Sequence, residues 1–302
     1  MDKYLLYFHI SWLSETDGPG KRVALFLQGC HLDCSWCHSP HSQPAESPIL
    51  YFDNLCKKCG RCQTTCPNNV HLISGNAHIL QRENCTHCGA CVEACPQSSQ
   101  LKHSGALILP TTKMKITQLF EMVKPQLELL GHDGGITFSG GEPLLQAEPL
   151  AAFAKMCKES GIHTALETSG IVPIEHIQAV HPFIDTWLVG IRLVTSKKNE
   201  QSEYLKNKTL KTLDYLTHKA NADIVVRIPV IPGITTTEVY LNAVHQLLQK
   251  YGIKKIEILP HNPESSHYYS AMGKTPMVKY DKNQAENMFK HVSNYLNYLP
   301  TI

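Results

Sequence analysis

The chain has 302 residues, of which 42% are hydrophobic, and its formal net charge is +2 at pH 7. This length suits one large α/β domain with a smaller module, and the near-neutral charge gives no electrostatic reason to expect a nucleic-acid or membrane partner. Residues 1–7 turn polar too soon for a signal peptide, and no apolar run is long enough to span a membrane. We therefore expect a cytoplasmic protein, with a monomer as the default state.

Cysteine usage is the strongest signal in the composition. Eleven of the twelve cysteines lie between Cys30 and Cys95, in spacings typical of metal ligands, and an enzyme-sized body follows them. In a reducing compartment this pattern indicates metal binding rather than disulfides. The remaining cysteine, Cys157, lies beside Phe153 and Met156 in a predicted helix, and we interpret it as a buried apolar side chain.

The first cysteine group follows an apolar run inside a strand that we predict over residues 20–29. Cys30, Cys34 and Cys37 have the spacing C-x3-C-x2-C. Three thiolates in so short a loop can hold three irons of a [4Fe-4S] cluster, which normally takes four cysteine ligands. The fourth iron would keep an open position, as catalytic metal sites do. The alternative is a zinc site, although zinc ligands usually come in pairs from two separated segments.

Residues 41–104 then hold two near copies of one motif, which indicates an internal duplication. Each copy has the spacing C-x2-C-x2-C-x3-C-P, which resembles that of bacterial two-cluster ferredoxins, where the fourth cysteine of each copy binds the other cluster. With four thiolates each, both clusters would lack an open iron, so we expect them to transfer electrons. We assign one [4Fe-4S] cluster to Cys56, Cys59, Cys62 and Cys95, and a second to Cys85, Cys88, Cys91 and Cys66.

After Pro110 the predicted helices and strands alternate. Together with the strand before the first cysteine loop they make six strand–helix units, which predicts a parallel sheet with right-handed crossovers. We predict helices over 112–130, 147–160, 174–180, 203–220, 238–251 and 282–298, and strands over 135–138, 163–166, 186–191, 224–228 and 255–259.

The residues around the first cysteine loop match the signature of a known family. With the three cysteines, the pattern D-G-P-G-x-R-x3-F-x2-G-C resembles the radical S-adenosylmethionine (SAM) enzymes, and among them the activating enzymes of glycyl radical enzymes. The resemblance extends from about residue 14 to about residue 273. The residues that carry the pattern are Asp17, Gly18, Pro19, Gly20, Arg22, Phe26, Gly29 and Cys30.

The resemblance implies the fold. Six units fall short of a closed eight-fold barrel and fit the partial (β/α)6 TIM-type barrel of this family, formed here by residues 1–40 and 105–302. Residues 41–104 would be an inserted, bacterial-ferredoxin-like domain with two [4Fe-4S] clusters. The active site would lie at the C-terminal ends of the strands, and the open side of the barrel would admit a segment of a protein substrate.

Short motifs at the strand ends resemble the SAM-binding motifs of the family. G-G-E-P offers glycines that allow close approach to the backbone and a carboxylate that suits the ammonium of SAM, and E-T-x-G and R-x-P-x2-P-G would lie near its carboxylate and ribose. The competing interpretations are a solvated turn for E-T-x-G and a structural ion pair for the arginine. The resemblance assigns SAM contacts to Gly140, Gly141, Glu142, Glu167, Thr168 and Arg227, and Trp36 would shield the cluster.

Two positions depart from the family pattern. Where the family has D-x-K after the fourth strand, this chain has Gly190 and Arg192, so no carboxylate remains for the monovalent-cation site of some members. Arg192 keeps the positive charge in a planar side chain. Where the family often has L-P-Y-H, this chain has His261 and Asn262 at the last two positions. We count Arg192 and His261 among the SAM contacts.

By this resemblance the cofactors are three [4Fe-4S] clusters and SAM. One electron would cleave the sulfonium bond of SAM, and the 5′-deoxyadenosyl radical would take a hydrogen from a glycine Cα of a partner glycyl radical enzyme, with a flavodoxin or ferredoxin as electron donor. One alternative is another radical SAM enzyme, acting on a different peptide or small molecule. Others are an iron–sulfur electron-transfer protein, which would not need so large a body, and a zinc-binding interaction module.

Overall fold

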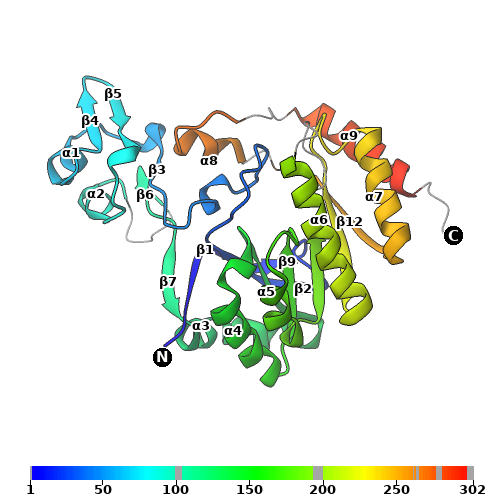
Figure 1. Ribbon diagram of the computed structural model, residues 1–302. Coiled ribbons are helices and arrows are strands. Elements are labelled where there is room, and N and C mark those ends of the chain that lie inside the picture. Colours follow the sequence, from blue (N-terminus) through cyan, green and yellow to red (C-terminus); the bar gives the residue numbers. More distant parts are fainter. Residues whose placement is uncertain are drawn as a thin grey trace.

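The computed structural model describes residues 2–98, 104–192, 200–260, 262, 265–276 and 281–297. It consists of an α/β body and a small module of short elements that lies to one side of it (Figure 1). None of the described helices combines the length and apolar character that crossing a bilayer needs.

One eight-stranded sheet organises the body. Six neighbouring strands are parallel, as the alternation of helices and strands predicts, and two antiparallel strands extend one edge. In spatial order the strands are β12 (Lys255–Leu259), β11 (Asp223–Pro229), β10 (Thr186–Gly190), β9 (His163–Thr168), β8 (Gly134–Gly140), β2 (Lys21–Leu27), β1 (Tyr4–Ser14) and β7 (Thr112–Lys115).

Amphipathic helices connect the parallel strands and bury one apolar face each. On the first of them, Leu119, Val123 and Leu127 recur at four-residue spacing and are all buried. They join Phe138 and Phe153 in the core of the body. The helices are α3 (Ile116–Leu130), α4 (Ala147–Glu159), α5 (Ile174–Val180), α6 (Glu200–Asp214), α7 (Glu238–Tyr251), α8 (Ser265–Ala271) and α9 (Lys282–Asn297).

The structure corrects two of the sequence predictions. The helix expected from residue 112 begins at Ile116, because Thr112–Lys115 is strand β7 and pairs with Tyr4–Tyr7 of β1. The long strand β1 itself was absent from the prediction. Strand β7 forms through pairing with a segment about 100 residues away, which local periodicity does not reveal. Strand β1 also pairs with β2, the next strand along the chain.

The small module has its own apolar group, formed by Ile49, Cys62, Cys91 and Leu107. Its two short helices lie side by side, and each follows a glycine in the left-handed conformation, with φ of 79° at Gly60 and 85° at Gly89. The two cysteine motifs therefore share one backbone geometry. The elements of the module are α1 (Arg61–Thr65), α2 (Ala90–Ala94), the antiparallel pair β3 (Leu50–Tyr51) and β6 (Leu107–Ile108), and the hairpin β4 (His71–Ser74) and β5 (Ala77–Leu80).

Short turns of helix occur in both the module and the body. The 3-10 turns are η1 (Pro40–Ser42), η2 (Asp53–Leu55), η3 (Arg82–Asn84), η4 (Gly131–Asp133), η5 (Pro143–Gln146) and η6 (His181–Phe183), and the π-helical turn η7 (Tyr215–Lys219) follows α6.

Helix α8 connects the module to the body. Leu50 and Ile108 of the module pack against Ala271 and Met272 at the end of α8. Arg82, three residues before the second cysteine motif, donates hydrogen bonds to the carbonyl oxygens of Ile49 and, at 2.6 Å, Ala271. The module is thus held by both apolar and polar contacts.

Candidate active site

A cavity of about 690 Å³ lies at the C-terminal ends of the parallel strands, under the first cysteine loop. A second depression, of about 770 Å³, lies at α4 and α5 and contains none of the residues predicted for the site. His261 falls outside the described residues. The predicted residues that line the strand-end cavity are Cys30, Cys34, Trp36, Cys37, Gly140, Gly141, Glu142, Glu167, Thr168, Arg192 and Arg227.

The three thiols of the first loop converge in a poorly solvated place. Burial, with a smaller contribution from neighbouring thiols of the loop, raises the pKa of Cys30 to about 12 and that of Cys37 to about 11. Such thiols give up their protons only when a positive metal centre compensates the charge. Three convergent soft ligands of this kind fit an iron–sulfur cluster with one free iron position.

Hydrogen bonds hold the loop in place from two sides. The backbone N–H of Cys30 donates to the carbonyl oxygen of Gln43 at 3.0 Å. From α8, the Tyr269 hydroxyl donates to the carbonyl oxygen of Ser35 at 3.0 Å, and burial raises the pKa of this phenol to about 12. Trp36, next to Ser35, is partly buried and lines the cavity.

The two glycines after β8 allow that strand end to pack against the cysteine loop. A Cβ atom at Gly140 would lie 2.4 Å from the nitrogen of Leu27, and one at Gly141 would lie 2.2 Å from the carbonyl oxygen of Gly29. The N–H of Gly141 donates to the carbonyl oxygen of Leu27 at 2.8 Å. These glycines therefore fix the distance between the G-G-E-P turn and the loop that carries the thiols.

Glu142 connects the ends of β8 and β9. Its carboxylate is 1% exposed. One oxygen accepts hydrogen bonds from Thr168 Oγ1 at 2.8 Å and from the N–H of Leu144 at 3.4 Å, and the other accepts from the N–H and hydroxyl of Ser169 at 3.0 and 2.7 Å. A carboxylate has about four acceptor sites. All are occupied by the protein, so this side chain braces the cavity wall.

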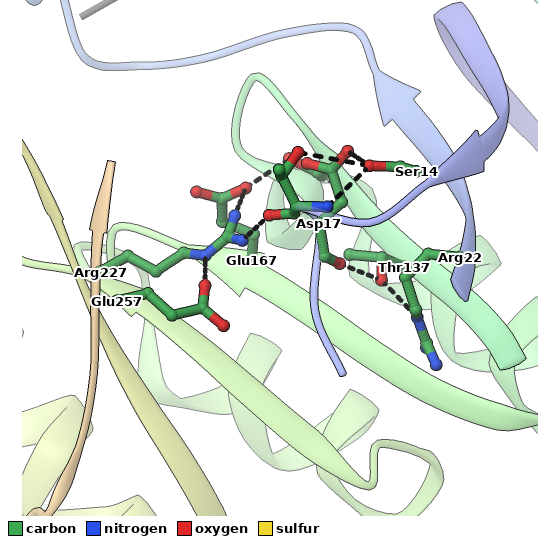
Figure 2. A network of polar contacts seen from close by, with 9 residues as sticks. Ser14, Asp17, Arg22, Thr137, Glu167, Arg227 and Glu257 are labelled. Carbon is green, nitrogen blue, oxygen red and sulfur yellow. Dashed lines mark hydrogen bonds and ion pairs between the residues drawn. The ribbon is translucent and has the colours of Figure 1, made fainter. Parts of the chain in front are cut away.

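Arg227 lies at the centre of an ion network below the cavity (Figure 2). Its guanidinium binds Glu167 at 3.1 Å and Glu257 at 2.8 Å, and it also donates to the carbonyl oxygen of Thr16. The two carboxylates raise the pKa of Arg227 although burial opposes this, and Arg227 lowers the pKa of Glu167 against the effect of burial. Arg227 thus makes structural ion pairs while it lines the cavity.

The D-G-P-G-x-R segment is fixed against strands β8 and β9 by a second buried arginine (Figure 2). Arg22 is 1% exposed, and its Nε donates to Thr137 Oγ1 at 3.0 Å. Thr137 in turn donates to the carbonyl oxygen of Asp17 at 2.5 Å. Gly20, with φ of 68°, has no space for a side chain, because a Cβ atom would lie 2.0 Å from the carbonyl oxygen of Asp133. The arginine of the pattern therefore has a structural role.

Arg192 is the second arginine of the cavity and differs from Arg227 in its contacts. Among the described residues, its Nη1 is a buried nitrogen without a hydrogen-bond partner. Burial raises the pKa of the Cys34 thiol, and the nearby Arg192 guanidinium partly offsets this effect. Arg192 is therefore a positive charge available to an anionic group in the cavity.

Among the polar residues that line the cavity and were absent from the sequence prediction are Asp17, Ser139 and Glu257. Ser139 donates to Glu167 at 2.7 Å. Glu257 had a usable signal, because a buried arginine in one strand needs a carboxylate nearby and Glu257 is the acidic residue of the next strand. Burial raises the pKa of the Asp17 carboxyl.

The module cysteines group across the two motifs. The pKa of Cys62 is raised to about 11, mainly by burial and also by the thiols of Cys56, Cys95 and Cys59. The pKa of Cys91 is raised to about 12, mainly by burial and also by the thiols of Cys66, Cys85, Cys62 and Cys88. Each buried thiol thus has the fourth cysteine of the other motif among its neighbours, which fits the crossed ligand sets of two-cluster ferredoxins.

Comparison with known proteins gives consistent matches over almost the whole chain. A family model described as a 4Fe-4S single cluster domain matches residues 16–213. A choline trimethylamine-lyase activating enzyme from Oleidesulfovibrio alaskensis is 31% identical over 281 residues, covering 90% of this chain and 88% of that protein. A (2S)-3-sulfopropanediol dehydratase activating enzyme from Klebsiella oxytoca is 32% identical over 303 residues, covering 97% and 93%.

A third relative, a trans-4-hydroxy-L-proline dehydratase activating enzyme from Clostridioides difficile, is 32% identical over 272 residues, covering 89% of this chain and 88% of that protein. These relatives share one kind of activity and differ in the enzyme that they activate. The chain belongs to the radical SAM activating enzymes of glycyl radical enzymes.

Proposed function

We propose that this oxidoreductase activates one glycyl radical enzyme and that it uses three [4Fe-4S] clusters to do so. The observation that carries the proposal is the convergence of Cys30, Cys34 and Cys37 over a strand-end cavity of about 690 Å³. When bound, the cluster of these cysteines supplies the electron that cleaves SAM to methionine and a 5′-deoxyadenosyl radical, which takes a hydrogen atom from a glycine Cα of the partner.

Different residues of the cavity would make different contacts with SAM. Arg192 offers a buried guanidinium nitrogen, Nη1, that has no partner among the described residues and suits the SAM carboxylate. The backbone at Gly140 and Gly141 permits close approach of the ligand, and the Thr168 end of β9 is braced by Glu142. We also propose contacts from Glu167, Arg227, Trp36 and His261.

We propose that residues 41–104, together with the short strand β6 (Leu107–Ile108) that pairs with β3, form a ferredoxin-like domain. This domain would pass electrons to the barrel formed by residues 1–40 and the remainder of residues 105–302. One cluster would be bound by Cys56, Cys59, Cys62 and Cys95, and the other by Cys85, Cys88, Cys91 and Cys66. The grouping of thiols around Cys62 and Cys91 supports these ligand sets. The contact between the module and α8, which also binds the first cysteine loop, supports transfer in this direction.

The remaining parts of the proposal concern the setting of the reaction. A flavodoxin or ferredoxin would donate the electrons, and the protein would work as a monomer in the cytoplasm, where thiols stay reduced. A small-molecule or peptide substrate remains the second candidate within the radical SAM enzymes. The three named relatives favour the activase, since each is an activating enzyme.

The test is the transfer of the radical to a partner. The reduced protein would be incubated anaerobically with SAM and, in turn, with candidate glycyl radical enzymes, and each mixture would be examined by EPR spectroscopy. We expect a glycine-centred radical with one partner, and we expect no radical when the partner's glycine is replaced by alanine. SAM cleavage without a radical on any glycyl radical enzyme of the same organism would favour the second candidate.

A further inference from the structure

Two buried histidines lie beside the first cysteine motif of the module, one on each strand of the β4–β5 hairpin. His71 is fully buried and His78 is 9% exposed. His78 Nδ1 lies 3.6 Å from Cys56 Sγ. His78 Nε2 lies 3.0 Å from His71 Nδ1 and 3.9 Å from Cys62 Sγ. The imidazole pair thus forms a chain that ends at a cysteine sulfur.

The protons of this pair can be placed from its surroundings. Burial favours neutral imidazoles, each with one donor and one acceptor nitrogen. If His71 donates to His78, then His78 Nδ1 carries the second proton and points it at Cys56, and His71 Nε2 is left as a bare lone pair. The opposite arrangement would leave a buried N–H at His71 Nε2, which has no partner in the described structure, and would turn a lone pair toward a thiolate.

We propose that His78 donates a hydrogen bond from Nδ1 to the Cys56 sulfur of the first module cluster, that His71 fixes the donating tautomer, and that this cluster therefore has a higher reduction potential than its twin. The inference rests on the proposed function, in which Cys56 is a cluster ligand. Hydrogen bonds to the sulfurs raise the potential because they stabilise the more negative, reduced form.

The second motif lacks such a donor chain in the described part of the module. Its histidine, His87, has Nδ1 4.0 Å from Cys85 Sγ on a side chain that is 31% exposed. At the first cysteine of each motif the backbone donors are alike, because Lys58 N and His87 N lie 3.4 Å from Cys56 Sγ and Cys85 Sγ, respectively. One further backbone donor, Val70 N, lies 3.5 Å from Cys66 Sγ, a ligand of the second cluster. The imidazole pair therefore distinguishes the surroundings of the two clusters. It gives the first cluster the higher reduction potential, so that this cluster is reduced before the second.

The ligand atoms of Cys62, His71 and His78 also lie within 4.8 Å of one another, which would suit a zinc ion. Cysteine and two histidines supply three ligands for such an ion, whereas Cys56 and Cys59 of the first motif and Cys95 of the second supply three further thiols around Cys62 for a cubane. The four-thiol set is the more complete one. Metal analysis separates the two cases.

The test is an anaerobic redox titration of the full-length, reconstituted protein, followed by EPR spectroscopy, with the barrel cluster identified as the signal that changes when SAM is added. His78→Phe keeps a ring against Tyr51, whose centroid lies 4.5 Å away, and removes the donor. We expect this variant to lower the midpoint potential of the first cluster. At the wild-type midpoint the ratio of reduced to oxidised cluster should fall about tenfold, which corresponds to a shift of about 59 mV for a one-electron couple. His71→Phe should give a smaller shift in the same direction.

Two further variants make the test specific. His78→Asn places an amide N–H near the position of Nδ1 and should restore most of the wild-type potential, and it carries the test if the phenylalanine variant fails to assemble. His87→Phe is the matched control at the second motif and should leave the first cluster unchanged. The inference is overturned if the His78 and His87 variants shift the first cluster equally, or if asparagine restores nothing.

Iron content distinguishes this failure from failure of the proposed function. Eight module irons, as two four-iron clusters require, with potentials unaffected by His78 would contradict the inference alone. A module that holds about four irons and one zinc would contradict both the assignment of Cys62 and the inference. Wild-type protein without module iron would overturn the electron-relay proposal together with it.

Discussion

Gly190, the last residue of β10, leaves space that the guanidinium of Arg192 occupies. A Cβ atom at Gly190 would lie 2.9 Å from Arg192 Nη1 and 3.1 Å from Nη2, so the absence of a side chain at residue 190 is what lets the guanidinium lie where it does. The two departures from the D-x-K pattern of the family are therefore one structural change. The cavity contains a fixed guanidinium at the place where the pattern has a carboxylate.

This pair predicts that Arg192→Met weakens SAM binding by about ten- to a hundredfold, because a hydrogen bond to a charged group contributes about 1.5–3 kcal/mol. Gly190→Ala should weaken binding as well, since the methyl group displaces the guanidinium. Equilibrium binding of SAM to the reconstituted protein measures both. Arg192→Lys keeps the charge and should lie between Met and wild type. Wild-type affinity in Arg192→Met would remove Arg192 from the binding site.

Arg22 predicts an effect on stability. Its guanidinium donates to Thr137 and to the carbonyl oxygens of Ile136 and Pro19, all within the sheet or the D-G-P-G turn. Arg22→Met leaves these buried acceptors without donors at a cost of about 3 kcal/mol, which corresponds to a fall of about 5 °C in the midpoint of thermal unfolding of a chain of this length. The adjacent Lys21 is exposed. Lys21→Met is thus the control, and equal midpoints for both variants would contradict the assigned role.

His41 predicts a dependence of stability on pH. The ring is 3% exposed between Phe8 and Tyr268, and burial, with a smaller effect of His9, lowers its pKa to about 4. Between pH 6.5 and 4 the unfolded chain therefore binds more protons here than the folded one, and stability falls as the pH falls.

At pH 5 the burial of His41 lowers the free energy of unfolding by about 2 kcal/mol. His41→Phe should remove it, so that the unfolding midpoint drops less between pH 7.5 and pH 5 than in wild type. The exposed His132 provides the control as His132→Phe. A pH dependence unchanged by His41→Phe would mean that this imidazole is protonated in the folded protein.

A substitution at Cys59 tests whether the module supplies electrons for catalysis. Replacement of Cys59 by alanine would remove one ligand of the first module cluster that we propose, and it should leave the proposed cluster of Cys30, Cys34 and Cys37 and its response to SAM intact. Turnover with a flavodoxin or ferredoxin should then slow, while turnover with dithionite, which reaches the barrel cluster directly, should change less. An unchanged rate with the protein reductant would argue against an electron-relay role.

The sequence predicted the parallel part of the sheet well, because its strands are continuous apolar runs separated by amphipathic helices. Helices α5 and α7 and strand β12 have the predicted bounds. Strand β7 was missed because it forms by an edge pairing with a segment far away in the chain, which has no local periodicity. Strand β1, which lies between β2 and β7, was missed as well. Helix α8 was missed as well. It is only seven residues long, and its importance lies in contacts with the module and the cysteine loop.

At the site, the sequence identified residues better than their contacts. The cysteines and the strand-end motifs were found because metal spacing and glycines are visible in a sequence. Thr168 and Ser169 donate hydrogen bonds to the Glu142 carboxylate. These contacts could not be predicted from the sequence, because they depend on how the ends of β8 and β9 lie beside each other. The pairing of Arg227 with Glu257 depends likewise on their register in β11 and β12.

The most direct test is to reconstitute the protein anaerobically with iron and sulfide, reduce it with dithionite in the presence of SAM, and measure 5′-deoxyadenosine against iron, in wild type and in Cys34→Ala. We expect about twelve irons per chain, three four-iron clusters, and steady formation of 5′-deoxyadenosine in wild type. Cys34→Ala should keep about eight irons and form none. About eight irons and no 5′-deoxyadenosine in the wild-type protein would mean that the loop of Cys30, Cys34 and Cys37 holds no working cluster, and would contradict the account.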